Sequence, residues 1–246
     1  MGEIVSIEGA RGRRAAAVAL FALAVAVAVF AVFPRVGLGP LPLVLAAAIL
    51  AAFCILVLVD RSASITAELG LDRPAPRGIA AGLVMALPMA GALALSREVV
   101  AAPSLAHALR FALATALAEE IAFRGLAFRL LARRARWGAP AAAIVTAVAF
   151  AIARVASAAG TAPPAELVEI ALLGAATAGW LAWLFAAWGD SLWVPLALHF
   201  GMNFAWALFQ GALVTGRGDP WGHVGRLASF AASVALTAWA RRRGKT

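Results

Sequence analysis

The sequence has few charged residues and a single cysteine. Only 13% of its 246 residues are Asp, Glu, Lys or Arg, whereas 64% are hydrophobic, and the mean hydropathy is +0.92. Soluble domains contain about a quarter charged residues, so this composition excludes an ordinary soluble domain and indicates an integral membrane protein. The lone Cys54 excludes an intrachain disulfide and a multi-cysteine metal site. Because the sequence shows no linker or low-complexity tract, we expect one integral membrane domain over residues 1–246.

Apolar runs long enough to cross roughly 30 Å of hydrocarbon recur along the chain. The expected fold is therefore all-α, a polytopic bundle of about eight transmembrane helices. The first run is too long for a typical signal-peptide core, and no clear cleavage site follows it. The longest polar connector is 60–77. The runs are 15–33, 41–59, 78–95, a fourth from about 104 that continues through the arginines up to 136 and leaves the hydrocarbon in its last turns, 139–158, about 166–188, 191–214 and 227–240.

The distribution of basic residues predicts that both termini are cytoplasmic. The net charge is +9, but the basic residues flank apolar runs instead of forming one face, so we expect no nucleic-acid partner. We expect a multi-pass protein in contact with lipid, in a bacterial plasma membrane. The positive-inside rule favours an orientation with these residues inside: Arg11, Arg13, Arg14, Arg61, Arg73, Arg77, Arg129, Arg133, Arg134, Arg136, Arg241, Arg242, Arg243 and Lys245. Outside or near an outer span end are Arg35, Arg97, Arg110, Arg217 and Arg226.

One stretch, residues 118–125, places three charges inside the fourth run and reads A-E-E-I-A-F-R-G. A charge near the bilayer centre costs about 3 kcal/mol or more, so ionisable residues there usually face a cavity and mark a functional site. Glu120 and Arg124 are four residues apart with the acid first, the favourable order for an intrahelical ion pair. Glu119 lies about 100° further round the helix, so we expect it to remain free of that pairing.

Polar side chains also lie deep in two other runs: Arg154 in the fifth, and His199 with Asn203 in the seventh. His199 and Asn203 are four apart and share one helix face. From the inner ends of their runs, Glu119 is about 15 Å deep and His199 about 13 Å deep, so they can meet. A carboxylate and an imidazole in a low-dielectric cavity can perform general acid and base chemistry, with the Asn203 amide donating to an oxyanion.

A structural interpretation competes with this catalytic one. Polar pairs at four-residue spacing often only fasten membrane helices together. A neutral cluster of Glu119 and Glu120 with Arg124 and Arg154 would also lower the free-energy cost of membrane insertion. We expect His107 and His223 to have no catalytic role, because His107 is about 18 Å along the helix from Glu119 and His223 falls in an outer loop.

The motifs resemble those of the CPBP intramembrane proteases, which include type 2 CAAX prenyl proteases and bacteriocin-immunity-type proteins. The first family motif, E-E-x-x-x-R, matches residues 119–124, and the third, H-x-x-x-N, matches 199–203. The resemblance covers residues 77–208, the expected protease-like core, and the L-G-L sequence at 69–71 is similar to a frequent family lead-in.

The resemblance implies a role for each matching residue. Glu119 is implied as the base that activates water, with Glu120 and Arg124 organising the site. His199 and Asn203 are implied to support the scissile carbonyl and its oxyanion. The implied activity is hydrolysis of a peptide bond in a membrane-associated protein or peptide. Catalytic roles thus fall on Glu119, Glu120, His199 and Asn203.

The second family motif, F-x-x-x-H, is only half matched, because Phe150 is followed by Arg154 where the family has histidine. Arginine stays protonated and can neither accept a proton nor coordinate a metal, although it can stabilise an oxyanion. Phe150, Arg154 and Arg124 are therefore expected to organise the site. We favour glutamate-activated water over a metal mechanism, while a divalent ion such as zinc, held by both glutamates and His199, remains an alternative.

Two other functions remain open. The substitution at Arg154 favours a catalytically silent relative that binds a membrane partner as an immunity or scaffold protein. Intramembrane acids and arginines also occur in small transporters and channels, although no paired repeats support that class here.

The direction of Arg154 is a further open point. By helical rise Arg154 is about 24 Å from the inner end of its run and about 9 Å from the outer end, similar to Glu169 at about 8 Å. Arg154 can therefore turn inward to Glu119 or Glu120, or outward to Glu169. The family resemblance favours the inward direction.

Overall fold

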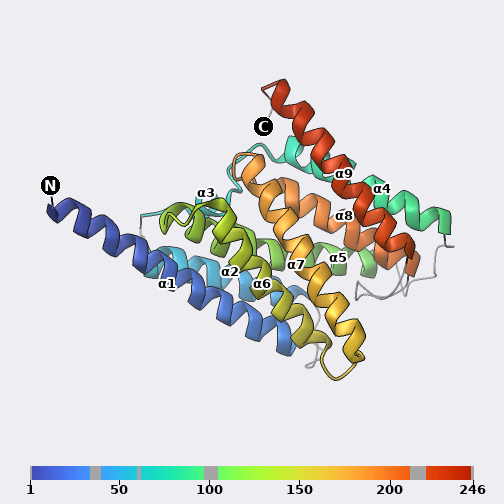
Figure 1. The fold of residues 1–246 in the computed structure, drawn as a ribbon, viewed down its shortest axis with the longest axis horizontal. Helices are drawn as coiled ribbons and strands as arrows, with labels where there is room; N and C mark the ends of the chain where they lie inside the picture. Colours follow the sequence, from blue (N-terminus) through green and yellow to red (C-terminus); the bar gives the residue numbers. More distant parts are fainter. Residues whose placement is uncertain (1, 34–39, 60–61, 97–104, 211–219, 245–246) are drawn as a thin grey trace.

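The computed structural model describes residues 2–33, 40–59, 62–96, 105–210 and 220–244 (Figure 1). Within these ranges the regular structure is helical throughout, which confirms the predicted all-α class. The elements are α1 (Gly2–Val32), α2 (Pro40–Ala52), η2 (Phe53–Val59), α3 (Ile65–Leu69), α4 (Ala75–Ser96), α5 (Leu105–Glu120), η3 (Ile121–Phe128), η4 (Leu130–Arg134), α6 (Gly138–Ala158), α7 (Pro164–Ala187), α8 (Trp193–Gln210) and α9 (Pro220–Arg242), where η marks π-helix.

Within the described residues, each predicted apolar run falls mainly on a helix, while residues 104 and 211–214 of two runs lie outside the described residues. Among the described residues, four helices are long and apolar enough to cross a membrane: Gly9–Val32, Ala75–Ser96, Gly138–Ala158 and Pro164–Ala187. Two shorter apolar stretches are Leu41–Leu56 and Trp193–Phe209. The architecture is therefore compatible with a membrane helix bundle, whereas the count of eight spans and the cytoplasmic termini stay predictions. Outside the described ranges lie Arg35, Arg61, Arg97, Arg217 and Lys245.

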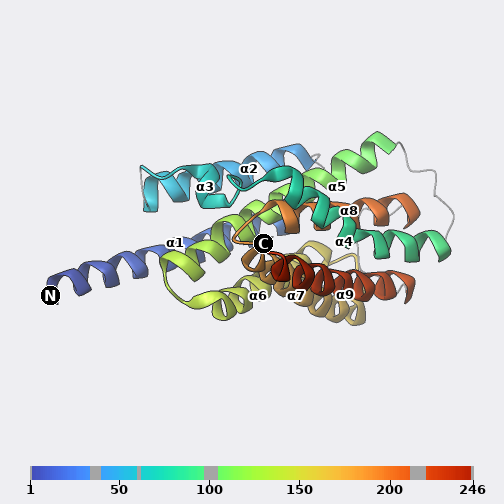
Figure 2. The same cartoon turned by 90° about the horizontal axis from the view of Figure 1, so that it is seen from above.

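The bundle has two apolar cores. Figure 2 shows α6, α7 and α9 on one side of the bundle and α2 with α5 on the other. The first core joins α1, α2, η3 and α6 around Phe123, Phe128 and Phe150. The second joins α4, α8 and α9 to the C-terminal half of α7, around Met85, Leu181 and Leu198. The fifth predicted run, which carries Arg154, thus belongs to the first core. The seventh, which carries His199 and Asn203, belongs to the second core, and the two cores meet at α5.

Glycines bring α4 and α8 unusually close together. A Cβ at Gly82 would lie 2.4 Å from the Val194 carbonyl oxygen, and one at Gly201 would lie 2.7 Å from the Ala86 Cβ. Small residues permit this approach in membrane helices, where packing between surfaces drives association. The close contact fixes the position of α8, and with it the depth of His199 and Asn203.

The segment predicted as a polar connector contains the short helix α3 and ties the arginine-rich end of η4 to the rest of the bundle. Arg129 donates to the Ala67 carbonyl, and Arg134 lies 2.5 Å from Glu68 Oε1. Arg133 forms a bidentate pair with Asp190 in the turn between α7 and α8, with both distances 2.9 Å. This hydrogen-bonded pairing raises the pKa of Arg133. The arginines from which the membrane orientation was predicted therefore also hold separate elements of the bundle together.

The L-G-L sequence at 69–71 requires glycine at its centre because the backbone of another segment lies very close to it. Gly70 ends α3 in the left-handed region, with φ of 73°, and a Cβ there would lie 2.0 Å from the Asp190 carbonyl oxygen. The Gly70 carbonyl accepts from the Leu192 amide at 3.0 Å. The α3 turn thus packs directly on the turn that precedes α8.

We predict that Gly70→Ala lowers the free energy of unfolding by about 3 kcal/mol or more, from left-handed strain plus the clash with Asp190. The matched control is Gly160→Ala, where φ is 89° but no atom lies within 4 Å of the added Cβ. Gly160→Ala should lower the free energy of unfolding only by the cost of the left-handed conformation, about 1–2 kcal/mol. Thermal unfolding in detergent, followed by circular dichroism, compares the two. Equal losses would contradict the role assigned to the Asp190 contact.

Candidate active site

Glu119 and Glu120 are the last residues of α5, where the hydrogen-bonding pattern changes to the π-helix of η3. The two residues are 4% and 0% exposed. Isolated π-helical turns are rare and frequently occur at functional sites. The sequence analysis predicted a regular α-helix through this motif, and no pattern in the residues signalled the change.

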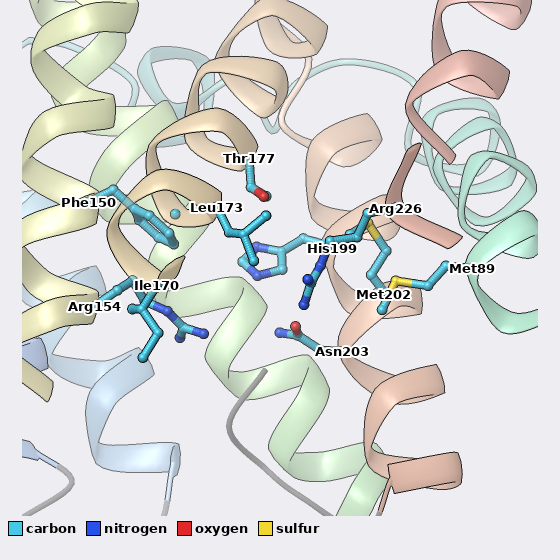
Figure 3. A pocket seen from close by; sticks show the side chains of 11 residues that line it. Met89, Phe150, Arg154, Ile170, Leu173, Thr177, His199, Met202, Asn203 and Arg226 are labelled. Carbon is cyan, nitrogen blue, oxygen red and sulfur yellow. The ribbon is translucent and has the colours of Figure 1, made fainter. Parts of the chain in front are cut away.

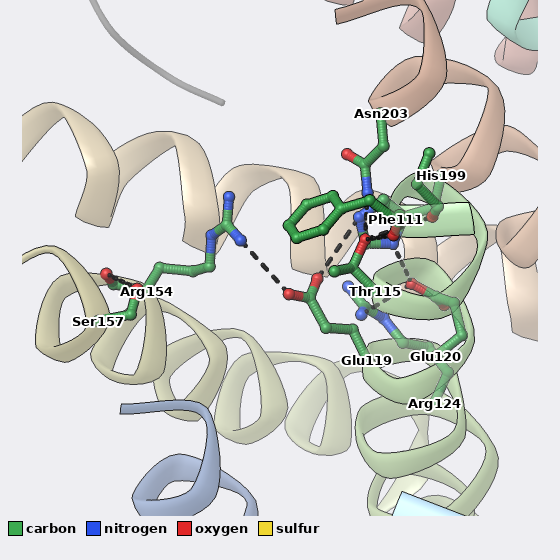
Figure 4. A network of polar contacts seen from close by, with 10 residues as sticks. Phe111, Thr115, Glu119, Glu120, Arg124, Arg154, Ser157, His199 and Asn203 are labelled. Atoms are coloured by element: carbon green, nitrogen blue, oxygen red, sulfur yellow. Dashed lines mark hydrogen bonds and ion pairs between the residues drawn. The ribbon is translucent and has the colours of Figure 1, made fainter. Parts of the chain in front are cut away.

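The Glu120 carboxylate accepts hydrogen bonds from two side chains. Arg124 Nη1 lies 3.0 Å from Glu120 Oε1, as the four-residue spacing predicted, and both side chains are at most 1% exposed. His199 Nδ1 lies 2.8 Å from the same oxygen (Figure 4). The motif on α5 is thus joined to the motif on α8, as the similar depths estimated for Glu119 and His199 predicted.

Glu119 takes no part in the Glu120–Arg124 pair, as helical spacing predicted, and its partners come from other helices. Arg154 Nη1 lies 3.3 Å from Glu119 Oε1, and His199 Nε2 lies 3.4 Å from Glu119 Oε2 without hydrogen-bond geometry. Figure 4 shows the Glu119 carboxylate between the Arg154 guanidinium and the His199 ring. These partners are the ones that the inward direction of Arg154 and the similar depth of His199 predicted.

Arg154 takes the inward direction of the two that were open. Its long side chain spans the depth difference estimated from backbone rise, and it passes Gly174 of α7, where an added Cβ would lie 3.7 Å from Arg154 Cγ. Glu169 lies 3.1 Å from His223 Nε2. His223 is in the first turns of α9 and not in an outer loop, because this helix begins at Pro220, earlier than its apolar run suggested.

Phe150 and Asn203 complete the cluster. The Phe150 ring faces both guanidinium groups, with Arg124 Cζ 5.0 Å and Arg154 Cζ 5.9 Å from its centroid. Such cation–π contacts stabilise a partly desolvated cation. The Asn203 amide is 3.4 Å from the Thr115 hydroxyl of α5, a partner that the sequence analysis did not identify.

The hydrogen bonds define where one mobile proton can reside. An ionised Glu120 paired with Arg124 only accepts, so the 2.8 Å contact requires His199 Nδ1 to donate. His199 Nε2 then faces Glu119 Oε2 at 3.4 Å. Glu119 and His199 therefore form a unit that can accept a proton and later release it.

A cavity of about 50 Å³ adjoins this unit (Figure 3). A cavity of this volume has room for a few water molecules but not for a peptide, since one water needs about 10–15 Å³ of such space. Glu119 is absent from its lining, and Arg154 and His199 stand at its wall. The lining consists of Met89, Phe150, Arg154, Ile170, Leu173, Gly174, Thr177, His199, Met202, Asn203 and Arg226.

The residues present do not fit a zinc site. Within the described part of the chain, no group of three or more His, Cys, Asp or Glu side chains is placed to hold a metal ion. Both glutamates near His199 are instead engaged by guanidinium groups. We therefore derive no step through a metal.

Arg226 is the one lining cation that sequence reasoning did not place in the site. It was counted only as an outer, topology-determining residue. A useful signal was present in α9, where the buried small residues Gly222, Gly225, Ser229 and Ser233 recur every three or four positions. This spacing marks the packed face of a helix that starts before its apolar run, and Arg226 lies beside that face.

Residues 101–205 match the family model of the type II CAAX prenyl endopeptidase Rce1-like proteins. The matched segment lies within the predicted core of residues 77–208 and contains both motifs. No curated protein and no solved structure matches the chain.

We predict that Arg124→Met lowers the free energy of unfolding by about 3–5 kcal/mol, because it leaves the Glu120 carboxylate buried without its cation. Adding Glu120→Gln should recover most of this loss, since an amide needs no counter-ion and its oxygen can still accept from His199. Thermal unfolding of the single and double variants in detergent completes the cycle. A double variant no more stable than Arg124→Met would show that the ion pair is not the source of the loss.

Proposed function

We propose that this integral membrane protein, whose residues 101–205 form a domain of the Rce1-like type II CAAX prenyl endopeptidase family, consistent with the CPBP group, is an intramembrane endopeptidase. The observation that supports this best is the contact between Glu119 and His199 beside a cavity inside a bundle of apolar helices. The substrate is a membrane-associated protein or peptide, reached from the cytoplasmic side under the predicted orientation.

The proposed reaction is hydrolysis by a glutamate-activated water. Glu119 accepts a proton as the water oxygen attacks the scissile carbonyl carbon. The carbon–nitrogen bond then breaks, and the Glu119–His199 pair returns the proton to the leaving amine. Glu120 and Arg124 hold His199 in the required tautomer and orientation, so they act by positioning.

The side chain of Asn203, in the cavity lining, can stabilise the developing oxyanion. Asn203 offers amide hydrogens one turn beyond His199, whereas the Arg154 guanidinium group is paired with Glu119 at 3.3 Å. Arg154 supplies a positive charge where the family motif has histidine. Since the cavity holds little more than water, substrate binding requires helices to separate.

A catalytically silent, partner-binding protein is the second candidate. It is favoured by the ion pair between Arg154 and Glu119 and by the absence of Glu119 from the cavity lining. The silent protein would keep the same fold and the same buried cluster.

We expect Glu119→Gln to reduce peptide hydrolysis by about 10²- to 10⁴-fold with the fold intact, because an amide cannot act as a base. The assay measures cleavage of a farnesylated CAAX peptide and of unmodified hydrophobic peptides by the purified protein in lipid. Asp72→Asn, which neutralises a surface carboxylate distant from the site, is the control. Substantial activity in Glu119→Gln would exclude the glutamate mechanism, and an inactive wild type would favour the silent candidate.

We expect Arg154→His to raise kcat by about tenfold, because the guanidinium group 3.3 Å from Glu119 is replaced by a neutral ring. Arg154→Lys keeps the charge and should remain as slow as the wild type. Single-turnover cleavage rates of the three proteins test this. If lysine accelerates the reaction as much as histidine, the charge of residue 154 is not what limits the rate.

A further inference from the structure

The small cavity adjoins a much larger, lipid-facing groove between α7 and α9. The groove has a volume of about 1050 Å³ and shares Leu173, Thr177 and Arg226 with the cavity lining. α7 packs mainly on α6 and α9 packs mainly on α4, whereas α7 and α9 touch each other little. An apolar segment can therefore enter the groove from the lipid without disturbing either of those helix pairs, and it then lies next to the cavity.

The charged side chains of the groove are engaged with one another. Glu169 Oε1 lies 3.1 Å from His223 Nε2, and Arg226 Nη1 lies 3.3 Å from His223 Nδ1. The Arg226 guanidinium also lies 5.0 Å from the Trp206 ring centroid. Most of the remaining wall is apolar, and large side chains such as Leu172 are exposed along it. The groove therefore offers a ligand a mainly apolar surface.

Small residues of α7 leave room in this groove. Ala175, Ala176 and Gly179 line it, and a Cβ added at Gly179 would find no atom within 4 Å. Small side chains let a second backbone approach closely inside a membrane. The α7 wall thus has space for the backbone of a polypeptide segment.

Thr177 is the uncharged polar group where the groove meets the cavity. A threonine hydroxyl in a helix can donate to a carbonyl one turn earlier, as Thr115 and Thr146 do in this chain. Among the described residues, the Thr177 hydroxyl has neither such a bond nor another hydrogen-bonding partner. Figure 3 shows this hydroxyl on the cavity side of α7. It is therefore available to a group that enters from the groove.

Thr177 also lies at the depth of the Glu119–His199 pair. α7 ends at Ala187, so by helical rise Thr177 is about 15 Å from that end. The same measure places Glu119 at about 15 Å and His199 at about 13 Å. A chain that passes Thr177 on its way from the groove to the cavity therefore reaches the pair without a change of depth.

A peptide backbone suits this junction better than a lipid tail does. An unwound peptide segment in hydrocarbon needs partners for its N–H and C=O groups. The threonine hydroxyl can donate to the carbonyl or accept from the amide. An acyl chain offers neither group and would leave the hydroxyl without a partner.

We propose that the groove between α7 and α9 takes up the membrane-embedded segment of the substrate polypeptide, and that the Thr177 hydroxyl binds the backbone of this segment beside the scissile bond. This inference rests on the proposed function. It makes Thr177 a substrate-binding residue and makes the face between α7 and α9 the entrance from the lipid.

The test measures docking by photocrosslinking, which requires no turnover. The probe is a hydrophobic peptide with a photoreactive diazirine side chain, added to the full chain in lipid nanodiscs. Mass spectrometry identifies the attached residues, and the dependence of the yield on peptide concentration gives the apparent Kd. Ala176→Trp fills the groove, and Ala231→Trp is its control at an exposed alanine of α9 outside the groove. Thr177→Val removes the hydroxyl with little change of shape, and Thr177→Ser keeps it.

The wild type should attach the probe to residues of α7 and α9 that line the groove. Ala176→Trp should weaken binding about tenfold or more, and Ala231→Trp should leave it unchanged. Thr177→Val should weaken binding about threefold to tenfold, as expected for one hydrogen bond, while Thr177→Ser stays within about twofold of the wild type. Among peptides with one amide replaced by an ester, one should bind the wild type more weakly than the parent but bind Thr177→Val equally well.

Attachment to other helices in the wild type, or unchanged binding in Ala176→Trp, would overturn the assignment of the groove. Equal binding by Thr177→Val and the wild type, or equal losses in Thr177→Val and Thr177→Ser, would overturn the role of the hydroxyl. Competition by oleate as strong as that of unlabelled peptide would assign the groove to lipid instead.

The outcome is separable from the question of catalysis. A chain that docks the probe in the groove but cleaves nothing would contradict only the proposed hydrolysis. A chain that cleaves peptides but docks the probe elsewhere would contradict only this inference.

Discussion

The ion pair between Glu120 and Arg124 is the constraint on which the rest of the site depends. Both side chains are withdrawn from solvent, and a lone charge in that position would be strongly destabilising. The pair shares its Glu120 oxygen with His199, so charge neutrality on one helix fixes the orientation of a ring on another. The charge of the preceding residue, Glu119, is likewise compensated by an ion pair with Arg154. Two acids and two arginines thus occupy one layer of an otherwise apolar bundle with no net charge.

This arrangement links folding and chemistry closely. In a soluble enzyme, water can solvate a carboxylate that is waiting to react, but in hydrocarbon each acid requires a specific partner. Arg154 provides one for Glu119 and at the same time restrains it. Where the resembling family motif has a histidine, which can accept a proton, this chain carries a permanent cation.

Much of the architecture could be predicted from the sequence because lipid imposes simple rules. Apolar run length located the helices, and four-residue spacing identified the contact of Glu120 with Arg124. Equal depth correctly brought His199 to the glutamates. The partner of Glu119 was not fixed by these rules, since side-chain reach across helices depends on local tilt and on space such as that above Gly174. Arg226 was missed because α9 is less apolar than the other helices and is defined by its small residues.

The ties made by the arginines of η4 have a mechanical consequence. Arg133 and Asp190 join the end of the helix that carries both glutamates to the turn that leads into α8, and the α3 turn packs against the same point. His199 lies about nine residues, or roughly 13 Å, beyond this junction. The junction is therefore a fixed point about which α8 can rotate. A rotation of α8 by a few degrees about it would shift the imidazole by about an ångström, which is enough to make or break its contact with Glu119.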